Sequence, residues 1–155
     1  MSVMQTESVP LASAARIGAV WHLPEVLRAR GVDLSDVLAD ADLRQDLFDS
    51  PENTVTFREF ERLLLTCERW TRCDHVSLLI AQRSRLAEMG AAGQIARVSA
   101  TVGEGLRSFA EHFNLQSTAS TVSLVTSGTF ARLVYAVSGP DMPASHHTQV
   151  GGVTI

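Results

Sequence analysis

Cysteine and histidine are the residue types in this sequence whose side chains could carry nucleophilic or metal chemistry. Cys67 and Cys73 lie six residues apart, and His75 follows two residues later. A thiol activated by a neighbouring imidazole is a nucleophile, so an enzyme using Cys67 or His75 is one hypothesis. The alternative is a core thiol within a helix and a histidine at a helix end. The pattern favours this alternative because Cys67 falls on an apolar stripe, so we do not expect an enzyme.

Other signatures of catalytic or cofactor sites do not occur in the sequence. Gly-x-Ser-x-Gly, His-x-x-x-His and Cys-x-x-Cys are all missing, and of the five histidines only His146 and His147 are adjacent. The glycines at 90, 93, 103 and 105 lack the Gly-Lys-Ser/Thr ending of a phosphate loop. The acidic segment 33–52 lacks the alternating oxygen ligands and central glycine of a calcium loop. We therefore expect no metal and no cofactor.

Length and charge limit the remaining possibilities. A chain of 155 residues predicts a single domain over 1–155, with a leader at 1–10 and a loop or tail at 139–155. Its 45% apolar content is enough to bury a core. The net charge is −4, and residues 1–52 hold nine acids against four arginines. Because no positive field covers the chain, it is not expected to bind nucleic acid by itself.

The cysteines and the apolar segments indicate a cytoplasmic protein. Six helical residues separate Cys67 from Cys73 by about 9 Å along the axis, which exceeds the reach of a disulfide. Both are therefore expected to be reduced thiols. The first ten residues contain no apolar signal-peptide core, and no apolar run approaches the length of a membrane span. We expect no membrane partner.

Hydrophobic spacing predicts helices over most of the first hundred residues. Residues 11–30 form a helix with a kink or a fresh start near Leu23, because Pro24 cannot continue a helix from before it. Gly31 ends this segment, and 34–39 and 43–48 form short helical turns before a loop that begins at Ser50-Pro51 and ends at Thr54-Val55.

The clearest helix follows this loop. Thr56 stands three residues before Glu59, which is the spacing of a capping box. An apolar stripe then predicts a buried face, and a second set of positions predicts a solvated one. The stripe is Phe57, Phe60, Leu64, Cys67 and Trp70; the solvated face is Arg58, Glu61, Arg62, Glu68, Arg69 and Arg72. Helices are also expected over 76–81, continuing to about Leu86, and over 91–100.

The part of the chain after residue 100 has a different pattern. Thr101 and Glu104 repeat the capping-box spacing and open a helix whose apolar side includes Leu106, Phe109 and Phe113. After Asn114, Ser, Thr and Val dominate, and 121–126 and 129–137 read as two strands joined at Ser127-Gly128. A lone hairpin is marginal, so it must pack on the helices. The predicted fold class is α+β, mostly helical, with a C-terminal antiparallel hairpin laid on the helices.

Residues 94–109 contain two predicted helices around a short connection, which is also the arrangement of a helix-turn-helix DNA reader. The second helix offers Arg107 against Glu104 and Glu111, whereas a recognition helix needs cationic and amide groups for phosphates and bases. The charges therefore favour two packed helices.

The succession of motifs resembles a known family. The segment 34–43, the loop ending in Thr54-Val55, the helix opened by 57–60, and the segment 99–106 with its following phenylalanines occur in this order. Over roughly 14–138, the sequence resembles the N-terminal sensor domain of AraC-type transcription regulators, in the branch labelled arabinose-binding-like. The resemblance implies a bacterial domain that binds a small-molecule effector or forms a homodimer. It also implies that DNA is bound by a C-terminal domain with two helix-turn-helix units, which this chain is expected to lack, as a fragment would.

Aromatic residues are the candidates for lining an effector pocket, because such pockets are mostly apolar. The alternative is that aromatic residues at helical spacing are plain core. The candidates are Trp21, Phe60, Trp70, Phe109, Phe113 and Tyr135.

Overall fold

The first element of the fold is a strand. The structure is a computed structural model that describes residues 14–118 and 120–137. Strand β1 (Ala14–Arg16) pairs antiparallel with β2 (Thr54–Thr56), with Ala15 opposite Val55. The prediction of a helix from residue 11 and of a loop through Thr54-Val55 is therefore wrong here. The pairing joins positions forty residues apart, which the local periodicity of either segment cannot reveal.

The helix predicted to begin afresh near Leu23 does so. A 3₁₀ turn (Ile17–Val20) precedes α1 (Leu23–Ala29), which carries its proline in the first turn, where the missing N–H is not needed. Gly31 then ends the segment with φ of 70°. Helix α2 (Leu34–Asp40) also agrees with its prediction, whereas the helical turn expected at 43–48 is only a 3₁₀ turn at Leu47–Asp49.

Helix α3 (Phe57–Thr71) begins at the predicted capping box. The Thr56 backbone N–H donates to Glu59 Oε2 at 2.6 Å, and the Glu59 N–H donates to Thr56 Oγ1 at 3.2 Å. The first four members of the predicted apolar stripe are buried, namely Phe57, Phe60, Leu64 and Cys67.

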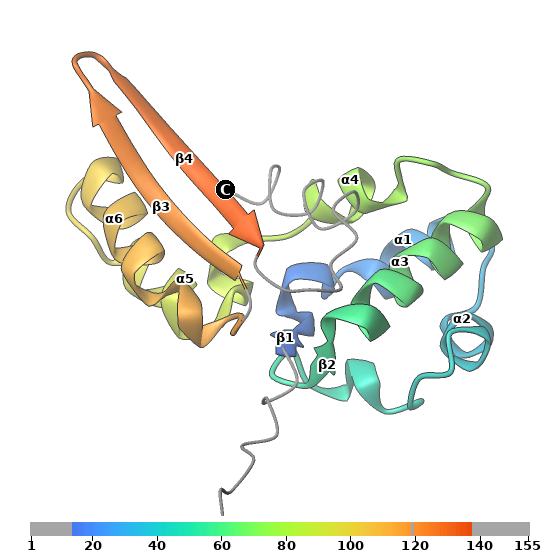
Figure 1. The fold of residues 1–155 in the computed structure, drawn as a ribbon. Helices are drawn as coiled ribbons and strands as arrows, with labels where there is room; N and C mark the ends of the chain where they lie inside the picture. The colour runs from blue at the N-terminus through green and yellow to red at the C-terminus, as the bar shows by residue number, and fades with distance from the viewer. Residues whose placement is uncertain (1–13, 119, 138–155) are drawn as a thin grey trace, which may run out of the picture.

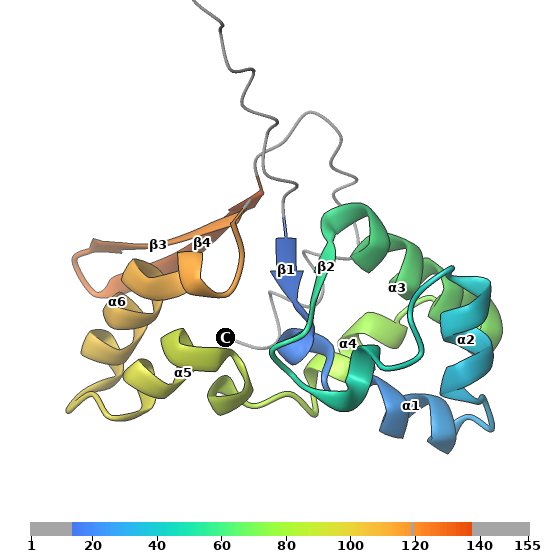
Figure 2. The same cartoon turned by 90° about the horizontal axis from the view of Figure 1, so that it is seen from below.

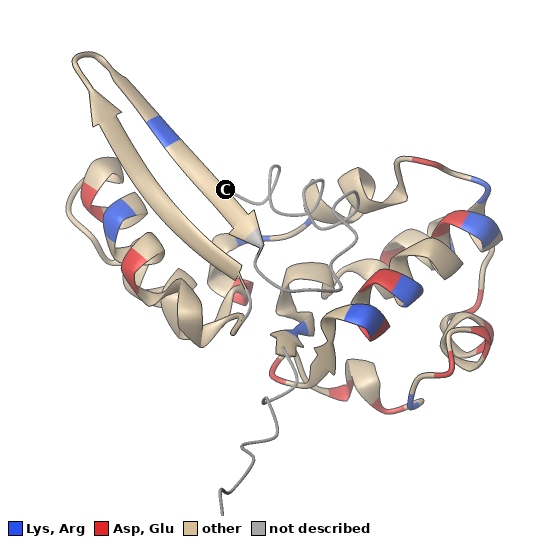
Figure 3. Ribbon diagram, in the orientation of Figure 1, with Lys and Arg blue, Asp and Glu red and all other residues tan. Residues whose placement is uncertain are grey.

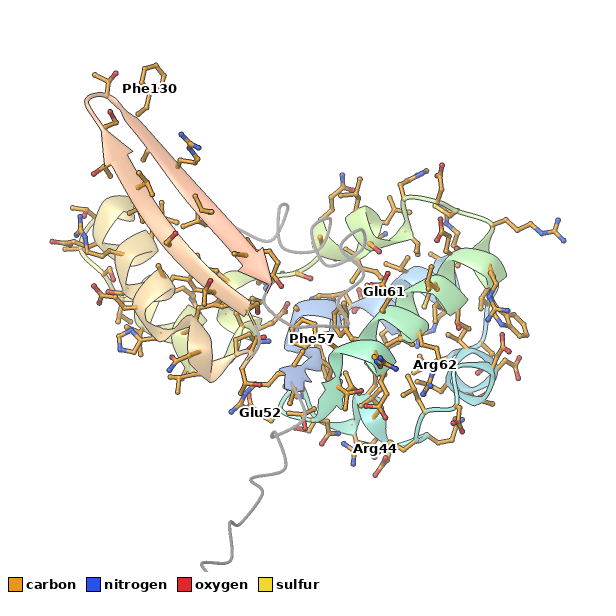
Figure 4. All side chains as sticks on the ribbon, viewed as in Figure 1. Arg44, Glu52, Phe57, Glu61, Arg62 and Phe130 are labelled. Atoms are coloured by element: carbon orange, nitrogen blue, oxygen red, sulfur yellow. The ribbon has the colours of Figure 1, made fainter. Side chains whose placement is uncertain are left out.

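Two positions of α3 differ from their predicted environment. Glu61 is only 5% exposed, because it lies one turn after Phe57 and one turn before Leu64 on the same face (Figure 4). Trp70 is 43% exposed, because it sits in the last turn, where its indole N–H donates to Asp40 of α2 at 2.8 Å.

Shorter helices follow along the chain. Helix α4 (Val76–Ala81) ends five residues before Leu86, so the predicted extension of this helix to Leu86 is wrong. The backbone of Arg85 is extended, and a separate 3₁₀ turn forms at Leu86–Glu88. Helix α5 (Gly90–Arg97) is shorter than the predicted 91–100. Helix α6 (Val102–His112) starts at the predicted capping box, where the Glu104 N–H donates to Thr101 Oγ1 at 3.2 Å.

The predicted hairpin closes the described chain. Strand β3 (Ser120–Ser127) pairs antiparallel with β4 (Phe130–Val137), and Gly128 turns between them with φ of 56°. Val122 lies opposite Tyr135, and these residues pack against α6. This confirms the predicted α+β class, mostly helical with an antiparallel hairpin on the helices (Figure 1). The predicted leader at 1–10 and tail at 139–155 lie outside the described residues.

The elements enclose two hydrophobic cores. The first lobe contains β1, β2 and α1 to α4, and the second contains α5, α6 and the hairpin (Figure 2). The buried residues of the second core are Met89, Ala92, Ala96, Phe109, Phe113 and Val122. Each lobe therefore has its own packed centre.

Polar contacts join the two lobes. The Nε2 atom of His22, before α1, lies 2.9 Å from Oε1 of Glu88, and the Ser84 hydroxyl donates to the Ala19 carbonyl at 3.0 Å. A Cβ on Gly18 would lie 2.3 Å from the Glu88 carbonyl, so the backbones can meet only because residue 18 is glycine. The lobes are thus joined near the 3₁₀ turn Leu86–Glu88, and also where Ala14 and Arg16 of β1 bond to residues 115–118.

Candidate functional site

A groove in the second lobe is the candidate site. It lies along α5 and α6 at the short connection between them, has a volume of about 400 Å³, and is open to solvent on one side. This volume falls in the range of about 300 to 1,000 Å³ that is usual for small-molecule pockets. The residues that line it are Leu86, Ala96, Arg97, Ser99, Ala100, Thr101, Val102, Gly105, Leu106 and Phe109.

Glycines allow the walls of the groove to approach one another. A Cβ on Gly105 of α6 would lie 2.9 Å from the Ala96 carbonyl of α5. A Cβ on Gly93 would lie 1.7 Å from the carbonyl of Leu86, at the start of the preceding 3₁₀ turn. Helices α5 and α6 therefore pack closely on one another, as the charge pattern predicted, and the connection between them bridges the end of the groove.

The groove combines apolar surface with a polar side formed by Arg97, Ser99 and Thr101. Phe109, at its base, is only 1% exposed. The Ser99 hydroxyl donates to the Ile95 carbonyl at 3.4 Å, and the Thr101 hydroxyl accepts the N–H of Glu104. Among the described residues that line the groove, Arg97 alone is charged. The arrangement can therefore hold an apolar molecule with an anionic or hydrogen-bonding end.

Apolar residues also stand at the connection itself. Val98 and Val102 are 85% and 81% exposed, although both are large hydrophobic residues. Val98 directly follows α5, and Val102 is the first residue of α6. Exposed apolar surface beside a groove is typical of a place where a ligand or partner covers it.

The six predicted pocket aromatics do not come together at one place. Phe109, Phe113 and Tyr135 form one cluster in the second core, with ring centroids 5.3 Å and 6.0 Å apart along that series. Burial raises the pKa of the Tyr135 phenol.

The other three candidates lie in the first lobe. Phe60 is buried in the first core, and Trp21 stacks on Phe48 with centroids 6.3 Å apart. Trp70 lies on the surface beside Asp40. Only Phe109 of the six lines the groove, so a pocket role for the other five stays a prediction.

Sequence reasoning did not single out most of the groove. The sequence patterns place Arg97, Ser99 and Val102 in two helices or in the connection between them, and they indicate no binding role for these residues. The signal that could have found them is the short connection itself, because two helices separated by so few residues must pack side by side. Gly105, placed four residues into the second helix, marks their close approach.

The nucleophile hypothesis meets a physical obstacle at Cys67. The thiol is fully buried in the first core, and this burial raises its pKa to about 12. It is therefore protonated at neutral pH and is a poor nucleophile. His75 is exposed and lies 2.8 Å from Asp74, its neighbour in the sequence.

Two further kinds of site can be tested in the described part of the chain. Over residues 14–118 and 120–137, no three His, Cys, Asp or Glu side chains gather as a metal site would require. Over the same residues, no helix has both the length and the apolar character to cross a membrane.

The comparisons with known proteins agree with the earlier resemblance. A family model described as the N-terminal arabinose-binding domain of AraC transcription regulators matches residues 31–153. The match covers more than three quarters of the chain and includes all of the groove. A search of the curated proteins gives no significant match.

Proposed function

We propose that this chain, which belongs to the family of N-terminal arabinose-binding domains of AraC transcription regulators, senses a small-molecule effector in the groove between α5 and α6. The family supplies the regulatory, ligand-binding role. The groove supports the location, because it has the volume of a small-molecule site and combines apolar residues with polar ones. The family name does not make arabinose the effector of this chain.

The effector acts by changing which arrangement of the helices is populated. A ligand that binds one arrangement more tightly shifts the protein towards it by the difference in binding free energy. We infer that this coupling passes from residues 1–155, acting as one domain in the bacterial cytoplasm, to a separate DNA-binding domain of the regulator. The second lobe is itself a poor DNA reader, because α6 sets Arg107 against Glu104 and Glu111.

Native mass spectrometry of the purified chain tests this function. We expect an extra mass that is retained in the native protein and lost on denaturation. Ala100→Trp places a large side chain on the groove wall and should abolish the retained mass. Ala91→Trp is the matched control, because Ala91 is exposed on α5 outside the groove. If Ala100→Trp melts like the control and keeps the same retained mass, the effector does not bind in the groove.

A second function, formation of a homodimer, is favoured by the outer face of the hairpin. Phe130 is 81% exposed at the far end of the hairpin, and Val125 is 50% exposed on the same face (Figure 4). Arg132 is the only charged residue in 120–137 (Figure 3). In the described residues, β3 and β4 pair only with each other, so both outer edges can accept another strand. We propose that a second copy of the chain covers this face.

Sedimentation equilibrium tests the homodimer. Phe130→Ser should weaken dimerisation, whereas Val98→Ser, which removes an equally exposed apolar residue near the groove, should leave it unchanged. A wild-type chain that stays monomeric at every concentration would contradict the dimer and leave the effector site as the surviving function.

A further inference from the structure

Arg97 is a cation in the groove that has no ion pair with any residue that the structure describes. It is the last residue of α5 and is exposed at the groove wall. No carboxylate among the described residues pairs with it. Of the nearby acids in the second lobe, Glu104 accepts the Thr101 N–H at 3.1 Å, and Glu88 is bonded to His22 and to the Arg85 N–H.

The position of Arg97 within α5 explains only part of its chemistry. A cation in the last turn of a helix is stabilised by the partial negative charge of the helix end. This interaction needs only the charge. The guanidinium also presents five N–H donors in a planar fork, and no acceptor among the described residues takes one. With respect to residues 14–118 and 120–137, the fork can therefore bind an anion with two parallel hydrogen bonds.

The rest of the groove selects what can accompany the anion. The half-buried Leu86 and Leu106 supply hydrocarbon surface above the buried Phe109, and Val102 extends it to the rim. Burying this surface against an apolar ligand is favourable in proportion to the area removed from water. Because Phe109 is buried and Arg97 exposed, the apolar part of a ligand belongs at the base and its charged end at the mouth.

We propose that the effector is an amphipathic monocarboxylate whose carboxylate is bound by Arg97. Its hydrocarbon part lies along Leu106 and Phe109. A carboxylate matches the single charge of the groove, whereas a phosphate monoester brings close to two negative charges, of which one has no partner on the described wall. The inference rests on the proposed function, since it assigns a chemical class to the effector of the same groove.

NMR titration of the isotope-labelled chain tests the assignment, because it reports both the affinity and the place of binding. The probes are octanoate and phenylacetate, their neutral counterparts 1-octanol and 2-phenylethanol, and octyl phosphate. Binding in the groove is followed at the amides of Ala96, Val102 and Leu106. The variants are Arg97→Gln and, as the matched control, Arg107→Gln, which removes an exposed charge of α6 outside the groove.

We expect at least one carboxylate to shift the groove amides and to bind roughly tenfold more weakly to Arg97→Gln, as expected for a charged hydrogen bond at a partly exposed site. Arg107→Gln should bind like the wild type. Equal binding of a carboxylate and its alcohol, unchanged by Arg97→Gln, overturns the role of Arg97 but leaves the groove as the effector site. Tighter binding of octyl phosphate overturns the carboxylate class. Shifts confined to residues outside the groove overturn both this inference and the location of the effector site. No shifts with any probe overturn this inference alone, because the location is tested separately by the retained mass of Ala100→Trp.

Discussion

Adding one methyl group to Gly93 should destabilise the second lobe, although alanine is the better helix former. Gly93 lies inside α5, where its backbone meets the Leu86 carbonyl. Gly103 is a useful comparison, because it lies in the first turn of α6, and a Cβ there would have no heavy atom within 4 Å. The same Gly→Ala change thus meets a crowded site in one helix and open solvent in the other.

The two contributions to stability have opposite signs at Gly93. Replacing glycine by alanine inside a helix gains up to about 1 kcal/mol of propensity. The new Cβ would lie 1.7 Å from the Leu86 carbonyl oxygen, so the backbones must separate by at least 1.3 Å to reach the 3.0 Å limit of real contacts. Forcing extra carbon into a packed interior costs about 1 to 3 kcal/mol or more, and the upper end applies because the obstacle is backbone. We expect a net loss of about 2 kcal/mol.

Urea unfolding and thermal unfolding, both followed by circular dichroism, measure this difference in stability. Gly103→Ala should gain about 0.5 kcal/mol, because only the propensity term applies. Gly93→Ala should melt roughly 4 to 8 °C below the wild type, given the usual shift of 2 to 4 °C for each kcal/mol in chains of this size. A Gly93→Ala protein at least as stable as Gly103→Ala would refute the close packing of Leu86 on α5, and with it this wall of the groove.

Three shorter predictions concern single groups. Thr101→Ala should lose about 1 kcal/mol of stability in the same unfolding assay, because the cap of α6 is removed; Thr101→Ser, which keeps the hydroxyl, should lose little, and equal losses would contradict the cap. The Thr56 N–H lowers the pKa of the Glu59 carboxyl below 4.5, so this charge stabilises the fold above pH 4.5 and less as the pH falls through the folded pKa. The stability difference between wild type and Glu59→Gln should therefore shrink on acidification from about pH 6, and a constant difference would contradict it. In a Cys73→Ser background, Cys67 should resist alkylation at neutral pH until urea unfolds the chain, because burial raises the pKa of this thiol to about 12. Labelling of the native protein at the rate of free cysteine would show that the thiol is accessible.

Local patterns predicted those parts of the fold that depend on neighbouring residues. The capping boxes at Thr56 and Thr101 each join residues three apart, so the sequence contains the whole interaction. The hairpin alternates over consecutive positions, and its class and approximate bounds followed from that alternation. The break at Pro24 likewise depends on a single residue.

Long-range contacts decided the parts that were missed. The pairing of Ala15 with Val55 gives the first segment a strand instead of a helix, and nothing within residues 14–16 signals the partner. The groove depends on Gly93 and Gly105, whose effect lies in what a side chain would strike on another element. The sequence gives Arg97 no feature that sets it apart from the other arginines. Its place beside an apolar wall depends on how α5 and α6 pack.

The carboxylate of Glu88 ties the 3₁₀ turn Leu86–Glu88 to the first lobe. Oε1 of this residue lies 2.9 Å from Nε2 of His22, while Oε2 accepts the Arg85 N–H at 2.8 Å and so holds the 3₁₀ turn closed. The side chain of Glu88 therefore bonds both to His22 of the first lobe and to the backbone that begins the 3₁₀ turn. These bonds hold the 3₁₀ turn against the first lobe, and the second lobe is held separately where Ala14 and Arg16 bond to residues 115–118. Leu86, which lines the groove, belongs to the same turn, so one wall of the groove is anchored to the first lobe through the bond between Glu88 and His22.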